Sequence, residues 1–412
     1  MKLALHTIFV LGFTSMGFTG MGVQAQGSAH WVGSWAASQQ IPEPANALAS
    51  DDLRDATLRQ TVHLSAGGSV LRVHLSNAFG TAALHVSSVH IARPVGPGGI
   101  DPATDHALLF SGREQVDIPP GAEYISDAIG FAAAPLSELT ISLHLDAAPA
   151  QETGHPGSRA TSYVAPGNVV AAAKLAAAKK VEHWYVVSGV DVVAAPEAFS
   201  VVALGDSITD GHGATTDGND RWTDVLARRL QENKSTRNVG VVNQGIGGNH
   251  LLTDGLGPNV LARFDRDVLA QTAVRYVIVL EGINDLGGLA RMKDVTAEQH
   301  EDLVHRMIGA YEQIVDRAHA HGVKVIGATM LPDTGSDYYH PDAANEADRQ
   351  KVNQWIRAAG HFDAVVDLDE VMSNPQDRTR LLPAYDSGDH LHPGPAGYKV
   401  MGEAFPVALF SK

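Results

Sequence analysis

The sequence predicts two parts of different fold class, an antiparallel β-sandwich or jelly-roll-like domain followed by a three-layer α/β/α domain with a parallel sheet. The apolar pattern has period two from about Trp31 to Val193, where Gly/Pro turns separate short runs. From about Phe199 onward, apolar β-rich runs alternate with helical patterns. The chain has 412 residues, of which 44% are apolar, so it can bury more than one core.

Period-two alternation predicts the strands of the first part. Residues 71–75, 84–86 and 139–145 alternate apolar and polar side chains, and turn clusters at 66–68 (AGG) and 95–99 (VGPGG) separate such runs. Short strands between Gly/Pro turns are typical of an antiparallel sandwich. We assign residues 26–195 to this β-rich domain.

The segment 171–180 (AAAKLAAAKK) breaks this pattern. We interpret it as a short exposed helix or a loop whose lysines are solvated, in preference to a lid or a binding element.

Apolar β-rich runs predict the parallel strands of the second part, residues 196–412. They lie at residues 200–204, 239–242, 276–280, 323–328 and 364–368. Two helical faces lie between them, formed by Trp222, Val225, Leu226 and Leu230, and by Leu303, Val304, Met307, Ile308, Tyr311, Ile314 and Val315. In such sheets the reacting groups gather at the carboxyl ends of the strands.

The N-terminus has the pattern of a secretory signal peptide. Lys2 precedes the apolar stretch Ile8–Phe13, and Val23–Ala25 matches a small-residue cleavage site. The alternative, a membrane anchor, needs about 20 mostly apolar residues, and Thr14 and Ser15 interrupt the run. We expect residues 1–25 to be cleaved and the protein to be exported, periplasmic or secreted, with no membrane insertion afterwards.

The charge and the lack of cysteine exclude several classes of function. The chain has 46 acidic and 30 basic side chains, a net charge of −16. Phosphate backbones and anionic lipids repel such a protein, so we expect no nucleic-acid partner. Because there is no cysteine, disulfides, thiolate metal sites and a cysteine nucleophile are excluded.

The first predicted parallel strand ends in residues 205–211 (GDSITDG). A small polar run directly after a buried strand can place Ser207 on a tight turn with its hydroxyl at the rim of the sheet. The alternative is a plain helix N-cap, where Ser and Asp are common.

The second strand ends in residues 243–249 (NQGIGGN), and glycine lets a backbone N–H approach a ligand closely. A phosphate cradle is not favoured, because no Walker lysine follows and the glycines lack the G-x-G-x-x-G spacing. An ordinary turn remains an alternative.

The third strand ends in residues 281–285 (EGIND). The carboxamide of Asn284 can donate a hydrogen bond to a developing oxyanion. Asn-Asp is also a common turn pair, so the motif alone does not decide.

Near the C-terminus, residues 389–394 (DHLHPG) place Asp389 three residues before His392. The carboxylate can fix the imidazole tautomer, and the imidazole can then serve as a general base. Two histidines and an aspartate are also metal ligands, but there is no H-E-x-x-H, so we expect no metal and no cofactor.

In this order, the four blocks resemble those of the SGNH (GDSL-type) hydrolases. Gly205-Asp206-Ser207 resembles the first block, Gly248 the second, Gly282-x-Asn284-Asp285 the third and Asp389-x-x-His392 the last. The resemblance covers residues 200–410. Family members often have Ser-Gly where this chain has Gly247-Gly248, so the choice of Gly248 rests on the alignment with Asn249.

The first part is similar to the β-domain that precedes this hydrolase in one subgroup of exported esterases. Trp31–Trp35 (WVGSW) and Ser76–Gly80 (SNAFG) carry this likeness, and both are less specific than the four blocks.

The resemblance implies a role for five residues. Ser207 would attack an ester carbonyl, His392 would take its proton, and Asp389 would orient His392. The N–H groups of Ser207 and Gly248, with the Asn284 side chain, would hold the oxyanion.

We therefore expect a metal-independent serine esterase of short-chain, acetyl-type esters, whose partner is a small-molecule or glycan ester. The loop 331–342 holds Tyr338 and Tyr339, which we place at the rim of the active site as substrate-binding residues. No long apolar segment resembles a lipase lid, and acetylated glycans are a candidate by fold analogy alone. The alternatives are a lysophospholipase or thioesterase, and a non-catalytic glycan-binding protein on a hydrolase scaffold.

Overall fold

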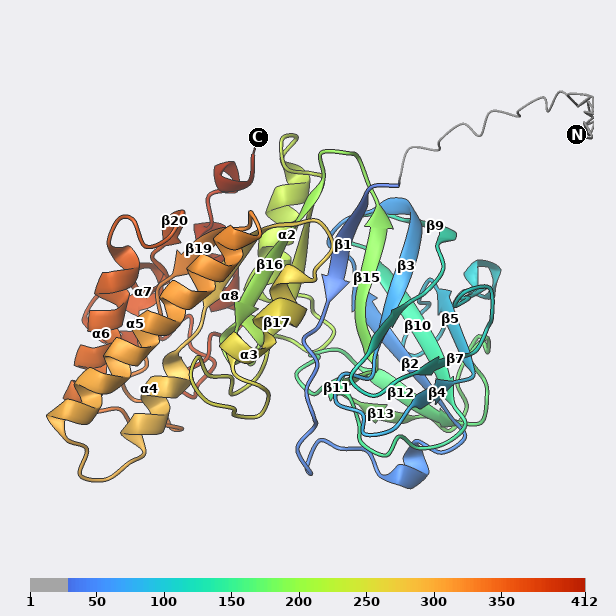
Figure 1. The fold of residues 1–412 in the computed structure, drawn as a ribbon, viewed down its shortest axis with the longest axis horizontal. Coiled ribbons are helices and arrows are strands. Elements are labelled where there is room, and N and C mark those ends of the chain that lie inside the picture. The colour runs from blue at the N-terminus through green and yellow to red at the C-terminus, as the bar shows by residue number, and fades with distance from the viewer. Residues whose placement is uncertain (1–28, 412) are drawn as a thin grey trace, which may run out of the picture.

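The computed structural model describes residues 29–411 (Figure 1). The predicted signal peptide, residues 1–25, lies outside them. Both predicted fold classes are confirmed: antiparallel strands make up the first part, and a parallel sheet with helices makes up the second. The strands of the first part end at Val193, and the parallel strands of the second part begin at Phe199. No helix among the described residues is long and apolar enough to cross a membrane.

Two antiparallel sheets form most of the first part. One contains β1 (Trp31–Ala36), β15 (Val187–Val193), β3 (Gly68–Ser76) and β8 (Glu123–Ile125) in that order, with β9 (Ile129–Ala133) also paired to β3. The other contains β13 (Lys179–Val181), β12 (Ser162–Pro166), β2 (Ala56–His63), β10 (Glu138–Leu145), β5 (Ser88–Ala92) and β6 (His106–Ala107). Two short pairs complete it, β4 (Leu84–Val86) with β7 (Val116–Ile118) and β11 (Gly154–His155) with β14 (Trp184–Tyr185). Short 3₁₀ turns lie at Ser50–Asp52 and Pro102–Thr104.

The apolar alternation predicted for these strands lies in the core between the sheets. Leu139, Ile141 and Leu143 of β10 are fully buried there. The outer face of the same sheet is covered as well, because Arg59 of β2 donates hydrogen bonds to Ser142 Oγ at 2.9 Å and to nearby backbone carbonyls. Both faces of this sheet are therefore buried at its centre.

The segment 171–180 forms no helix, so of the two predicted forms the structure shows the loop. The Val170 carbonyl just before it accepts a hydrogen bond from Arg59 at 2.9 Å, and its last residues enter β13, which pairs with β12. Strand pairing at its end and the tie to Arg59 at its start outweigh the helix propensity of its alanines.

The second part is built on five parallel strands. Their order is β17 (Val239–Gly245), β16 (Phe199–Gly205), β18 (Val274–Leu280), β19 (Lys324–Ala328) and β20 (Ala364–Val366). The last strand is shorter than predicted, because Asp367 caps a helix that begins at Leu368. The helices are α1 (Ser207–Asp210), α2 (Trp222–Glu232), α3 (Val260–Phe264), α4 (Ile283–Ala290), α5 (Ala297–Ala320), α6 (Ala343–Arg357), α7 (Leu368–Met372) and α8 (Pro395–Ala404). A π turn follows α3 at Asp265–Leu269, a β pair joins Ser373–Asn374 to Asp377–Leu381, and a 3₁₀ turn lies at Val407–Phe410.

Helices cover both faces of the parallel sheet. Val201 and Ala203 of β16 pack into one core with α2, α7 and α8, whereas Val202 and Leu204 pack into another with α3, α4, α5 and α6. The two predicted helical faces point into these cores, and of their members only Ile308 and Val315 are partly exposed. The three-layer arrangement follows from this alternation.

The two parts are in close contact along β1, which Figure 1 shows between them. Gly33 N–H donates to Ser200 Oγ at 3.0 Å, and Val241 N–H donates to Ser65 Oγ at 2.8 Å. A Cβ on Gly240 would lie 2.1 Å from the Gly33 carbonyl oxygen, so only glycine fits there. The WVGSW motif therefore serves the contact between the two parts.

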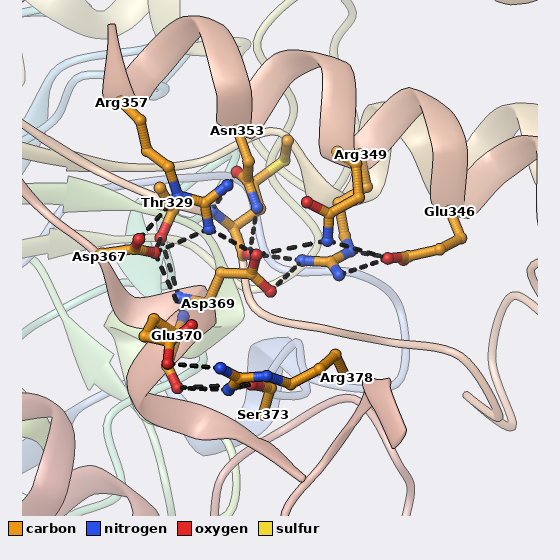
Figure 2. Close-up of polar contacts among 12 residues, drawn as sticks. Thr329, Glu346, Arg349, Asn353, Arg357, Asp367, Asp369, Glu370, Ser373 and Arg378 are labelled. Carbon is orange, nitrogen blue, oxygen red and sulfur yellow. Dashed lines mark hydrogen bonds and ion pairs between the residues drawn. The ribbon is translucent and has the colours of Figure 1, made fainter. Parts of the chain in front are cut away.

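A network of ion pairs, buried at Arg349 and partly exposed at Arg357, joins α6 to α7 (Figure 2). Arg349 contacts Glu346 at 2.7 Å and Asp369 at 2.7 Å, while Arg357 contacts Asp367 at 2.7 Å and Asp369 at 2.6 Å. Arg349 also donates to the Met330 carbonyl at 2.9 Å, which ties the network to the loop after β19. This loop, residues 331–342, reaches the site described next.

Candidate active site

Ser207 is the first residue of α1, immediately after the carboxyl end of β16. The cap of this helix is Asp206, whose side chain accepts a hydrogen bond from Ile208 N–H at 2.9 Å. The helix ends after one turn at Gly211, which has φ +104°. A Cβ on Gly205 would lie 2.3 Å from Thr209 Oγ1, so glycine is required for the sharp strand-to-helix turn.

His392 and Asp389 lie against this serine. His392 Nε2 is 2.8 Å from Ser207 Oγ, and His392 Nδ1 is 2.6 Å from Asp389 Oδ2. Ser207 and His392 come from segments 185 positions apart in the chain. The structure thus brings these three predicted site residues into one hydrogen-bonded chain.

Hydrogen bonds to both of its oxygen atoms hold the Asp389 carboxylate in place. Its Oδ1 accepts the backbone N–H groups of Leu391 at 3.0 Å and His392 at 2.8 Å. Burial alone would raise its pKa, but hydrogen bonds from the His392 side chain and backbone outweigh burial and hold the pKa well below the usual range. Asp389 is therefore ionised at neutral pH and can keep the proton of neutral His392 on Nδ1.

The backbone N–H groups of Ser207 and Gly248, the two predicted oxyanion donors, belong to residues that line one pocket. Among the hydrogen bonds between described residues, none uses the N–H of Ser207 or of Gly248. Gly248 has φ +66° and lines the same pocket as Ser207. Gly247 N–H is equally unused and also lines the pocket, so the choice of Gly248 stays a prediction.

The carboxamide of Asn284, near the start of α4, is fixed by two hydrogen bonds. Its Nδ2 donates to the Asn249 carbonyl at 2.6 Å, and its Oδ1 accepts from the Tyr339 hydroxyl at 2.5 Å. The amide orientation is therefore determined, and one Nδ2 hydrogen is left for a ligand in the pocket that Asn284 lines.

Three carboxyl groups lie buried behind the serine, on Asp206, Glu281 and Asp285. Burial raises the pKa of all three, and mutual repulsion raises the pKa of Glu281 further. The carboxylate of Asp285 accepts the N–H groups of Leu251 at 2.8 Å and Leu252 at 3.1 Å, which orders the segment after Gly248.

A pocket of about 550 Å³ opens beside Ser207 and His392. Its lining from the second part includes Ser207, His212, Gly247, Gly248, His250, Leu256, Asn284, Arg291, Tyr338, Tyr339, Leu391 and His392. Its lining from the first part includes Gln40, Glu43, Asn46, Pro156, Gly157, Arg159, Glu182 and His183. The antiparallel part therefore forms one wall of the site.

Tyr338 and Tyr339, which belong to the loop 331–342, both line this pocket. The Tyr338 ring is edge-on to the His392 ring at 5.8 Å between centroids, and it is 45% exposed. Tyr339 packs beneath the Arg291 guanidinium and against Gly287. Tyr339 thus contacts the carboxamide of Asn284, while Tyr338 contacts the imidazole.

Sequence reasoning missed the residues that surround His392 from other segments. His212 packs on the His392 ring at 4.1 Å between centroids, and Arg159 donates to His212 from the antiparallel part. The sequence feature that could have indicated a role for His212 is its position, five residues after Ser207. For Arg159 the sequence offers no signal.

His212, Asp389 and His392 also form a group whose ligand atoms lie within 4.8 Å of one another, close enough for a metal ion. However, both ring nitrogens of His392 already have partners, Ser207 and Asp389, and His212 Nδ1 accepts from Arg159. These nitrogen atoms therefore fit a chain of hydrogen bonds better than the coordination of a cation.

Residues 203–400, which span all four motif blocks, match the model of the GDSL-like Lipase/Acylhydrolase family. Similar solved structures include a putative lipolytic protein of the G-D-S-L family from Desulfitobacterium hafniense DCB-2 (24% identity, 50% of this chain and 96% of that one, TM-score 0.37). A GDSL-like lipase from Bacteroides thetaiotaomicron VPI-5482 is similar (22%, 50% and 84%, TM-score 0.37). An acetylxylan esterase from Geobacillus stearothermophilus is also similar (22%, 50% and 92%, TM-score 0.37). No curated protein matches significantly.

Proposed function

We propose that this protein is a serine esterase that cleaves short-chain carboxylic esters with Ser207, His392 and Asp389. The match of residues 203–400 to the GDSL-like Lipase/Acylhydrolase family supports a carboxylic ester hydrolase. The observation that carries the finer proposal is the hydrogen-bonded chain from Ser207 Oγ through the His392 ring to Asp389, with distances of 2.8 and 2.6 Å.

In the first step, Ser207 Oγ attacks the ester carbonyl while His392 Nε2 takes the hydroxyl proton. Asp389 keeps the other ring proton on Nδ1 and stabilises the imidazolium that forms. His392 then gives its new proton to the departing alkoxide, so the alcohol leaves and the acyl group stays on Ser207.

The negative charge of the tetrahedral intermediate needs donors that are in place before the reaction. The N–H groups of Ser207 and Gly248 and the second Nδ2 hydrogen of Asn284 supply them in this proposal. Water then attacks the acyl-enzyme, with His392 as base, and the acid is released.

The pocket favours a small acyl group and a polar alcohol. Most of its lining residues have polar side chains, and the leucine side chains in it are Leu256 and Leu391. A long acyl chain needs a continuous apolar channel, because each buried CH₂ contributes about 0.8 kcal/mol. We infer an acetyl-type ester of a hydroxylated compound such as a glycan, rather than the lipid or thioester substrates of the alternatives.

Export remains part of the proposal and has a separate test. The N-terminal residue of the protein released by a bacterial host identifies the cleavage site. Gln26 supports cleavage after residue 25, and Met1 on a membrane-bound product contradicts it.

The activity test uses p-nitrophenyl esters from acetyl to palmitoyl, with Ser207→Ala in parallel. We expect rapid cleavage of acetyl and butyryl esters and a loss on the order of 10⁶ in kcat for Ser207→Ala, with Asp389→Asn losing roughly 10⁴. A preference for long chains favours the lysophospholipase alternative. If no chain length shows Ser207-dependent turnover, while the protein binds acetylated glycan, the non-catalytic alternative is correct.

A further inference from the structure

Arg159 reaches from the antiparallel part into the active-site pocket. Its Nη2 donates a hydrogen bond to His212 Nδ1 at 3.0 Å. Among described residues it has no acidic side chain within ion-pair distance, and its buried Nε has no hydrogen-bond partner. Its backbone is in the left-handed region, at φ +46°, which is rare for a residue with a side chain. A strained, unpaired arginine is thus directed at a single imidazole.

Arg159 contacts His212, and His212 in turn lies against the proposed catalytic residues His392 and Asp389. Its ring lies 4.1 Å from the His392 ring, centroid to centroid, at 43°. Its Nε2 lies 3.8 Å from Asp389 Oδ2, the oxygen that binds His392. Its backbone carbonyl accepts the Tyr398 hydroxyl at 2.6 Å, which fixes its position.

We propose that Arg159 is a positioning residue for ester hydrolysis: it holds His212 as the neutral imidazole with its proton on Nε2, directed toward Asp389. This inference rests on the proposed roles of His392 and Asp389. A guanidinium has only donors, so the nitrogen it contacts must be the acceptor, and the ring proton must be on the other nitrogen. The antiparallel part would thereby take part in catalysis through the contact of Arg159 with His212.

The charge of His212 matters because His392 becomes cationic during turnover. Burial lowers the pKa of His212, and the nearby His392 and Arg159 lower it further against the pull of Asp389 and Asp210, to about 4. A cationic His212 would face the His392 imidazolium at ring-contact distance and compete for Asp389. Burial is the main cause that keeps His212 neutral above pH 5, and the charge of Arg159 adds to it.

The test is the pH profile of kcat/KM for p-nitrophenyl acetate with Arg159→Met, which keeps an unbranched apolar stem and removes the donor and the charge. Without Arg159 we expect His212 to titrate nearer the ordinary histidine value of about 6.5. Because burial still lowers the pKa of His212 in the variant, the shift is partial: at pH 5.5 the variant should lose about threefold more activity, relative to its own value at pH 8.5, than the wild type loses.

Two further variants separate this role from a general defect. Arg159→Met with His212→Gln removes the titrating ring and should return the acid limb to that of the wild type. Arg54→Met removes an exposed arginine of the antiparallel part and should leave the profile unchanged. If Arg159→Met does not fold, the ¹⁵N shifts of the His212 ring in the wild type decide the question, because the inference requires protonated Nε2 and bare Nδ1 at pH 7.

The outcomes separate this inference from the proposed function. No Ser207-dependent hydrolysis by the wild type overturns the proposed function itself. Normal hydrolysis with an unchanged acid limb in Arg159→Met, or a limb that the double variant does not restore, overturns the role of Arg159 alone.

Discussion

His155 and Asp210 are joined by a hydrogen bond between His155 Nε2 and Asp210 Oδ1, 2.8 Å long, across the boundary between the antiparallel and parallel parts. Both side chains are 4% exposed. The second ring nitrogen of His155 is 2.8 Å from the Ser38 carbonyl oxygen. Asp210 ends the one-turn helix that begins at Ser207, so the antiparallel part holds this helix from outside.

Replacement of His155 by alanine should therefore destabilise the protein and lower activity together. The change leaves the buried Asp210 carboxylate without this partner, a loss of about 1–3 kcal/mol. Urea unfolding measures it, and His85→Ala is the control, because His85 contacts Asp117 at an exposed site. Equal stability of the two variants would contradict a clamping role for His155.

The fold was largely predictable because it follows from local patterns. Period-two alternation marked β10, and the apolar face of α2 marked a helix on the parallel sheet. Three of the four motif blocks follow the parallel strands β16, β17 and β18, and the carboxyl ends of such strands are where reacting groups gather. Ser207 and His392 meet there although 185 positions separate them.

The wall that the antiparallel part contributes could not be predicted in the same way. Arg159 and His155 lie in loop and edge segments whose sequence carries no period, and their partners depend on how two separate cores pack. The segment 171–180 shows the same limit, since its tie to Arg59 outweighs its local helix propensity. Contacts between distant segments are decided by tertiary packing.

Tyr339 should affect turnover through Asn284. Tyr339→Phe removes the hydroxyl that fixes the Asn284 carboxamide and keeps the ring, so kcat should fall about tenfold with little change in KM, less than the 10²–10³ expected for Asn284→Ala. Tyr338→Phe is the matched control, because Tyr338 contacts His392 through its ring, which the substitution keeps. A larger loss in Tyr338→Phe than in Tyr339→Phe would reverse the assignment.

Metal removal should leave activity intact. His392 uses both ring nitrogens for Ser207 and Asp389, and hydrolysis through this chain needs no cation. Activity after dialysis against EDTA is the measurement. Added Zn²⁺ should inhibit, because a cation bound by His212, Asp389 and His392 would take away the base. Loss of activity in EDTA that Zn²⁺ restores would show a metal enzyme instead.

Asp333 should make the protein less stable as the pH rises. This side chain is 4% exposed, and its Oδ1 is 4.0 Å from Arg349 Nε, whose charge is already shared with Glu346 and Asp369 (Figure 2). Burial raises the pKa of Asp333 to about 7, against the attraction of Arg349. Since the ordinary value for aspartate is about 3.9, the folded state binds this proton more tightly than the unfolded state does. Stability is therefore lost between about pH 4 and pH 7.

Asp333→Asn removes this penalty, so the variant should gain on the order of 4 kcal/mol over the wild type at pH 8.5 and almost nothing at pH 4. Urea unfolding across this pH range gives the difference. Asp367→Asn is the control of opposite sign, because hydrogen bonds from Arg357, Glu370 N–H and Thr329 outweigh burial and lower the pKa of Asp367. That variant should lose stability at pH 8.5. If Asp333→Asn is equally stable relative to wild type at both pH values, Asp333 is ionised in the folded protein, and the charge of Arg349 suffices for three carboxylates.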